Sequence, residues 1–176
     1  MLFRSVVAAQ VTNEARSIAR RMGGAQVATI GRLEVYPNLV NVVPSSVTFT
    51  VDLRNTDETK LQQAEQALLA FVRSMAAEER CDVVTRSLAR FEPVEFDEDM
   101  VALVETTAKA RGYSVRRMPS GAGHDAQMLA RVCPTAMIFV PSINGLSHNL
   151  GENTAPGDLE AGATVLLDVV RELAQR

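Results

Sequence analysis

The chain contains two histidines, and both lie in loops rich in glycine and serine. His124 belongs to the segment PSGAGHDAQ and His148 to the segment PSINGLSHNLGENTAP, and each segment follows a short strand-like run. Ligand-binding and catalytic groups of α/β sheets collect in loops at the carboxyl ends of strands. Small neighbours such as Gly121 and Gly123 leave an imidazole accessible. The alternative is a loop histidine that only hydrogen-bonds a backbone carbonyl.

Two kinds of chemistry can be weighed for these loops. Nucleophilic catalysis has Ser120, Ser142 and Ser147 available, but none lies in a GxSxG turn, and no third group is placed to orient a histidine base. A zinc-type site needs three or four converging ligands, whereas the sequence offers His148 with Glu152 four residues later. If the chemistry depends on a metal, the remaining ligands lie outside this sequence.

A third candidate site lies in the first half of the chain. Asn41 precedes Pro44 in a turn between two strand-like segments, and Arg54 ends the second segment on its polar face. An amide and a guanidinium at adjacent ends of a sheet can hold a carboxylate by charge-assisted hydrogen bonds. The spacing alone favours a simpler interpretation, a turn asparagine and a solvated arginine paired with Asp52 or Asp57.

Composition limits the class of protein. The chain has 176 residues, of which 47% are apolar and 22% charged, and it carries a net charge of −3. These values are typical of a globular, soluble protein and argue against nucleic acid as a partner. The sequence shows neither an apolar run long enough to span a membrane nor a signal peptide, so we expect a cytoplasmic location and no membrane partner.

The first half has the pattern of a small α+β unit. Apolar residues recur every three or four positions from Phe3 to Met22, which predicts a helix ended by Gly23 and Gly24. The segments 27–37 and 46–54 alternate as strands with one buried face, the first with Val27, Thr29, Gly31, Leu33 and Val35 inward. A helix with Leu61, Ala64, Leu68, Val72 and Met75 inward and a strand over Cys81 to Leu88 follow. This order predicts a ferredoxin-like unit that lacks its first strand.

The second half has the pattern of the end of an α/β domain. An acidic linker with a proline, residues 91–99, precedes a helix from Glu98 to Arg111 that Asp97 caps and Gly112 ends. Strands are expected over Tyr113 to Met118 and over the apolar run 135–141, and a short helix over Asp125 to Arg131. The last helix is expected to bury Leu159, Ala163, Leu166, Val170 and Leu173. We therefore predict two domains, residues 1–91 and 92–176, and both are incomplete.

Three motifs carry a resemblance to a known family. The runs GRLEVYPNLVNVVPSSVTFTVDLRN, MPSGAGHDAQMLA and MIFVPSINGLSHNLGENT, in this order and spacing, resemble the N-carbamoyl-L-amino-acid amidohydrolases, a family that includes β-ureidopropionase and allantoate amidohydrolase. The resemblance covers nearly the whole chain. It implies a dimeric enzyme with a metallopeptidase-like catalytic domain (α/β), interrupted by an α+β lid that forms the dimer contact. Residues 1–91 would then belong to the lid and 92–176 to the catalytic domain.

The resemblance also implies roles for particular residues. His148 matches a ligand of a dinuclear centre of zinc, manganese, cobalt or nickel ions. Asn41 and Arg54 match lid residues that bind the substrate carboxylate in the active site of the partner subunit. Gly121, Gly123 and His124 match a loop that lines the pocket of a small ureido-acid substrate. No residue of this chain matches a catalytic acid or base of the family.

The chain also departs from the family pattern. It begins inside the first lid helix, so the family's first catalytic segment, with the other metal ligands, the glutamate base and a lid histidine, is absent. We expect the isolated chain to be inactive and not to hold two metal ions stably. Two hypotheses follow: the carboxyl-terminal portion of an amidohydrolase, or a non-catalytic module that dimerises through the lid sheet.

Overall fold

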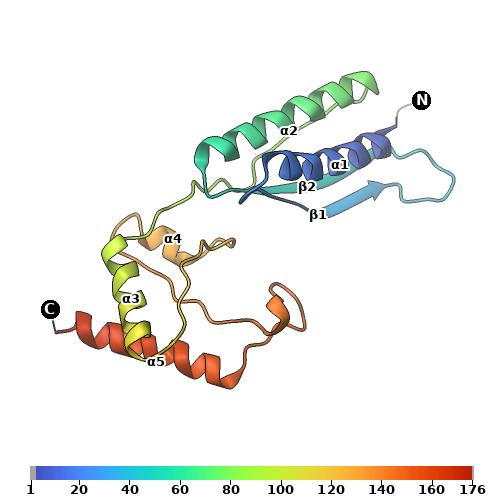
Figure 1. Ribbon diagram of the computed structural model, residues 1–176. Helices are drawn as coiled ribbons and strands as arrows, with labels where there is room; N and C mark the ends of the chain where they lie inside the picture. Colours follow the sequence, from blue (N-terminus) through green and yellow to red (C-terminus); the bar gives the residue numbers. More distant parts are fainter. Residues whose placement is uncertain (1–2, 176) are drawn as a thin grey trace. The chain divides into compact units, whose positions relative to one another are not determined.

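The protein divides into two compact units, residues 1–93 and 94–176. The computed structural model describes residues 3–175, so the ends of the predicted domains at residues 1, 2 and 176 lie outside the described residues. The amino-terminal unit contains, in chain order, α1 (Arg4–Met22), β1 (Val27–Tyr36), β2 (Ser46–Arg54) and α2 (Glu58–Glu78) (Figure 1). The carboxyl-terminal unit contains α3 (Glu98–Ala110), α4 (Asp125–Leu129), a 3-10 turn η1 (Ile143–Gly145) and α5 (Pro156–Leu173).

Local chemistry accounts for the end of α1 and the start of α2 in the amino-terminal unit. At the end of α1, Gly23 has a φ of 60°, and its N–H donates to the carbonyl of Ala19 at 3.0 Å. Glycine accepts this left-handed conformation at little cost, which is why it ends helices. At the start of α2, the carboxylate of Asp57 accepts a hydrogen bond from the backbone N–H of Lys60 at 3.1 Å. The predicted helix from Phe3 to Met22 is confirmed to within one residue.

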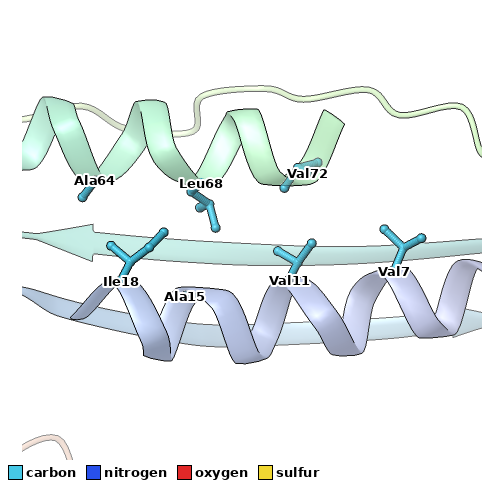
Figure 2. Close-up of a cluster of buried hydrophobic side chains, with 7 residues drawn as sticks. All are labelled: Val7, Val11, Ala15, Ile18, Ala64, Leu68 and Val72. Carbon is cyan, nitrogen blue, oxygen red and sulfur yellow. The ribbon is translucent and has the colours of Figure 1, made fainter. Parts of the chain in front are cut away.

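The core of this unit lies between the two helices and one face of the hairpin. Figure 2 shows side chains of α1 pointing toward those of α2, and the buried set consists of Val7, Val11, Ala15, Ile18, Ala64, Leu68 and Val72. Strand residues that include Ile30, Phe49 and Val51 pack against this cluster. The opposite face of the hairpin is polar and exposed, and it carries Arg54 as predicted.

The predicted core face of β1 is wrong in its first half. Ala28 and Ile30 pack against the core, whereas Val27 and Thr29 pair with Arg54 and Asp52 on the polar face. A register irregularity midway along β1, a β-bulge, inserts an extra residue and reverses the alternation. Beyond the bulge, Leu33 and Val35 lie opposite Phe49 and Val47, on the side that the sequence predicts.

Three predicted strands are absent from the structure. The segments Cys81 to Leu88, Tyr113 to Met118 and 135–141 carry no strand pairing, and the described residues form one sheet, of β1 and β2. Strands exist only where a neighbouring strand completes their backbone hydrogen bonds. The two-stranded, two-helix unit is compatible with the predicted α+β arrangement, while its ferredoxin-like topology and the assignment of lid and catalytic domains remain predictions.

The carboxyl-terminal unit is built on the contact between α3 and α5. The carboxylate of Asp97 accepts from the N–H of Met100 at 2.9 Å, so the predicted cap of α3 is confirmed. Ala108 of α3 is buried against Val165 and Val169 of α5. Of the predicted buried face of α5, Leu173 packs against this cluster, but the rest of the prediction is wrong: Leu159, Leu166 and Val170 are all more than half exposed. The helix carries two apolar stripes, and α3 packs on the other one.

The segment 135–141, which precedes the His148 loop, contacts α5 closely at one point. An ideal Cβ added to Gly162 would lie 2.5 Å from Cγ1 of Val140, so glycine is the residue that permits this contact. Ile138 packs against the α3–α5 cluster from the same segment. The run 135–141 thus lies against α5 although it pairs with no strand. None of the described helices has both the length and the apolar content needed to cross a membrane.

Candidate functional site

The loop that carries His148 is closed at its base by a backbone hydrogen bond. The N–H of Ile143 donates to the carbonyl of Asn153 at 2.8 Å, which joins the two ends of the loop next to η1. Inside the loop, the N–H of Gly151 donates to Oδ1 of Asn149 at 2.9 Å. This second bond uses a short polar side chain to satisfy a backbone group, as is usual in turns rich in asparagine and glycine. The loop is therefore ordered by its own residues.

His148 has a left-handed backbone, with a φ of 55°. Its backbone N–H donates to Oε2 of Glu152 at 2.8 Å, and the N–H of Glu152 donates to the carbonyl of Asn149 at 3.0 Å. Residues with a Cβ rarely adopt this conformation, which costs about 1–2 kcal/mol. The sequence predicted the loop and the exposed position of His148, but neither the left-handed backbone nor its contact with Glu152.

The structure limits what metal chemistry this chain supports. Within residues 3–175, no three side chains of His, Cys, Asp or Glu converge on a position that could hold a metal ion. His148 itself is exposed, and an imidazole on an ordered loop fits the role of a single ligand. Within the described residues of one chain, His148 therefore belongs to no cluster of three such ligands.

His124 has a structural role that the sequence did not reveal. Its Nδ1 accepts the backbone N–H of Ala126 at 3.1 Å, so His124 caps the short helix α4. Since Nδ1 is the acceptor, the neutral ring carries its proton on Nε2, and this N–H is the group that remains for a ligand. Gly121 and Gly123 lie next to open space, where an added Cβ would meet no atom within 4 Å. An open loop with one ring N–H suits the binding of a small polar ligand.

The predicted carboxylate-binding pair does not come together within one chain. Asn41 is exposed in the loop before β2, and Arg54 is the last residue of β2. The strand covers nine residues, so at about 3.3 Å per residue its ends are roughly 26 Å apart. Arg4, at the start of α1, donates to the carbonyl of Pro44 at 3.3 Å, which holds the Asn41 loop at the far end of the hairpin (Figure 1). Within one chain, the simpler interpretation that the spacing favoured is therefore confirmed: Asn41 lies in a turn and Arg54 pairs with Asp52.

Arg54 has a partner on its own strand. Its Nη2 donates to Oδ2 of Asp52 at 2.6 Å, and its Nε lies 3.1 Å from both carboxylate oxygens. This hydrogen bond raises the pKa of Arg54, and the Coulombic attraction of Asp52 acts in the same direction. Both side chains are nearly half exposed, and exposed ion pairs are weak. Exchange of Asp52 for another carboxylate at Arg54 therefore costs little free energy.

Three comparisons place these loops among known proteins. The model of peptidase family M20/M25/M40 matches residues 5–172. The chain is 41% identical over 156 residues to an allantoate amidohydrolase from Escherichia coli (strain K12), a match that covers 89% of this chain and 38% of the relative. It is 38% identical over 168 residues to an N-carbamoyl-L-amino acid amidohydrolase from Geobacillus stearothermophilus, with 96% of this chain and 41% of the relative covered.

The same similarity appears in solved structures. A crystal structure of an amidase of the hydantoinase/carbamoylase family from Burkholderia vietnamiensis superimposes with a TM-score of 0.90 at 41% identity. That match covers 93% of this chain and 40% of the other. The chain therefore spans about two fifths of the length of the relatives that it matches, as the 38% and 41% coverage of the two enzymes also indicates.

Proposed function

Because this chain belongs to peptidase family M20/M25/M40, we propose that it forms part of a metal-dependent amidohydrolase acting on ureido acids. The proposed reaction is hydrolysis of a carbon–nitrogen bond in N-carbamoyl amino acids, allantoate or ureidopropionate. Its main support is the 41% identity to a relative named allantoate amidohydrolase, over 89% of this chain. Since the chain spans 38% of that relative, the activity is proposed for an assembly that also supplies the remaining metal ligands.

In this proposal His148 is one metal ligand. The support is its exposed imidazole on a loop closed by the Ile143–Asn153 hydrogen bond. A zinc, manganese, cobalt or nickel ion held there would polarise the ureido carbonyl and acidify a water. His124, Gly121 and Gly123 would line the substrate pocket, with Nε2–H of His124 as a hydrogen-bond donor to the substrate.

Arg54 and Asn41 are proposed to bind the substrate carboxylate as parts of two different chains. Their positions at opposite ends of β2 prevent one chain from placing both at one carboxylate. A homodimer formed through the amino-terminal unit would bring Arg54 of one protomer near Asn41 of the other. This arrangement keeps the carboxylate-binding role that the resemblance implies for each residue, but it divides the two roles between protomers because of the distance along the hairpin.

The test compares two variants of the assembled enzyme. Arg54→Ala should raise KM for an N-carbamoyl-L-amino acid by about 10- to 100-fold with little change in kcat, since it removes a contact made equally in the ground and transition states. His148→Ala should abolish turnover at saturating metal. Ammonia release under steady-state conditions measures both effects.

The matched control is Arg32→Ala. Arg32 is an exposed arginine on the same polar face of the hairpin, paired with Glu34 at 2.6 Å, and its loss should leave KM unchanged. Full activity of His148→Ala, or equal KM values for the Arg32 and Arg54 variants, would contradict the proposed roles.

A second candidate function is a dimerisation module without catalysis. The observation that favours it is the loop between β1 and β2, where four apolar side chains are exposed: Leu39, Val40, Val42 and Val43. In addition, each strand of a two-stranded sheet has an outer edge with free backbone groups, which invites pairing between chains. In this case the amino-terminal unit would bind a second copy, and the His148 loop would have no chemical role.

A further inference from the structure

The left-handed backbone of His148 requires a structural explanation. Besides His148, the described non-glycine residues with positive φ are Arg80 and Asn144. A left-handed residue with a side chain is maintained only where its surroundings hold it, and such residues concentrate at functional positions. The neighbouring left-handed residue, Asn144, is of a type that tolerates this conformation well. Histidine also adopts positive φ more often than most residues with a Cβ, but the conformation persists only where contacts of the loop hold it.

Glu152 provides such a contact. Its Oε2 accepts the backbone N–H of His148 at 2.8 Å, and its own N–H donates to the carbonyl of Asn149 at 3.0 Å. Glu152 therefore contacts the chain at two points, one at His148 and one immediately after it. Hydrogen bonds to a carboxylate are stronger than those between neutral groups. The side chain of Glu152 thus contacts the backbone of His148.

We propose that Glu152 is a positioning residue for His148: its carboxylate holds the left-handed backbone and so sets the direction of the exposed imidazole. The proposal rests on the proposed function for what the imidazole binds, a divalent metal ion. The alternative is that Glu152, four residues after His148, is itself a second metal ligand. A ligand would act through a bond to the metal ion, whereas a positioning residue acts through its hydrogen bond to the His148 amide.

Substitutions at residue 152 separate these roles. Glu152→Gln keeps an oxygen that accepts the His148 N–H but removes the charge, so it should preserve the backbone. Glu152→Ala removes the acceptor, and Glu152→Asp keeps the charge on a side chain one methylene too short to reach. Glu160→Gln on α5 is the matched control, an exposed glutamate of the same unit.

The experiment uses the complete 176-residue chain, labelled with 15N. The first measurement is hydrogen exchange of the His148 amide. Glu152→Ala and Glu152→Asp should accelerate it by about tenfold or more, the factor expected for loss of a hydrogen bond to a charged acceptor. Glu152→Gln and Glu160→Gln should remain within about threefold of the wild type. Unchanged exchange in both Glu152→Ala and Glu152→Asp would overturn the proposal.

The second measurement titrates Mn²⁺ and follows paramagnetic broadening of the imidazole signals. The ring of His148 should broaden at lower Mn²⁺ concentration than that of His124 in the wild type and in Glu152→Gln, and this difference should be lost in Glu152→Ala. Loss of selective broadening in Glu152→Gln with unchanged amide exchange would identify Glu152 as a ligand and refute positioning. Equal broadening of both rings in the wild type would refute the proposed role of His148 as a metal ligand. The role of Glu152 in holding the His148 backbone would still be tested by the amide exchange measurement.

Discussion

Replacing Gly162 with alanine should loosen the carboxyl-terminal unit. The added Cβ would lie 2.5 Å from Cγ1 of Val140, whereas carbon atoms in contact are normally about 3.5–4.0 Å apart. One of the two side chains, or the helix itself, must therefore shift by about 1 Å. Valine is stiff at χ1, so rotation relieves little of this overlap.

The expected magnitude is the difference of two opposing effects. Overpacking of this kind costs about 1–3 kcal/mol. Alanine in the interior of α5 recovers about 0.5–1 kcal/mol, because glycine loses more conformational entropy in a helix. The net change in the free energy of unfolding is a loss of about 1 kcal/mol, or roughly a fivefold increase in the open population.

Native-state hydrogen exchange of the α5 amides measures this change in the unit concerned. Gly157→Ala is the matched control, since Gly157 lies in the first turn of the same helix and has no atom within 4 Å of an added Cβ. It should exchange no faster than the wild type. Combining Gly162→Ala with Val140→Ala removes Cγ1, so alanine at residue 162 should no longer destabilise the helix. Equal effects of Gly162→Ala in both backgrounds would refute the overlap as the cause.

Two further predictions concern charge and assembly. Hydrogen bonds from Lys109 and then from Arg117 lower the pKa of Glu105 below its ordinary value of 4.5; the resulting stability is present above that value and is lost as the pH falls through the lowered pKa. The midpoint urea concentration for unfolding should therefore decrease less on acidification in Glu105→Gln than in the wild type. An equal decrease in both proteins would exclude the contacts of Glu105 with Lys109 and Arg117 as the cause. If the apolar loop between β1 and β2 mediates dimerisation, Val40→Asp should lower the dimer fraction in sedimentation velocity. A wild-type chain that remains monomeric up to about 100 μM, a concentration at which weak dimers are populated, would exclude that interface.

Much of the helical structure was predictable because its signals are local. The cap at Asp97 and the glycine at residue 23 act within one turn of a helix, and the apolar spacing of α1 depends only on residues three or four apart. The inward face of α5 was not predictable in the same way. That helix has two apolar stripes, and the choice between them depends on where α3 packs.

The candidate site shows the same division. Glycine and serine around His148 predicted an accessible ring, and the ring is exposed. The contact between Glu152 and the His148 amide depends on the path of the loop, which carries no periodic signal. Likewise, the spacing of Asn41 and Arg54 suggested adjacent ends of a sheet, but the loop before β2 places them at opposite ends of the hairpin.

The sequence by itself determined the positions of the helices, the order of the three motifs and, through them, the membership of a hydrolase family. Helix caps, apolar periodicity and motif residues are properties of short stretches of chain, so they can be read without coordinates. Tertiary structure alone decided the bulge that turns β1 over, the stripe of α5 that is buried and the left-handed backbone of His148. Each of these depends on which distant residues meet, and that is settled only when the whole chain packs.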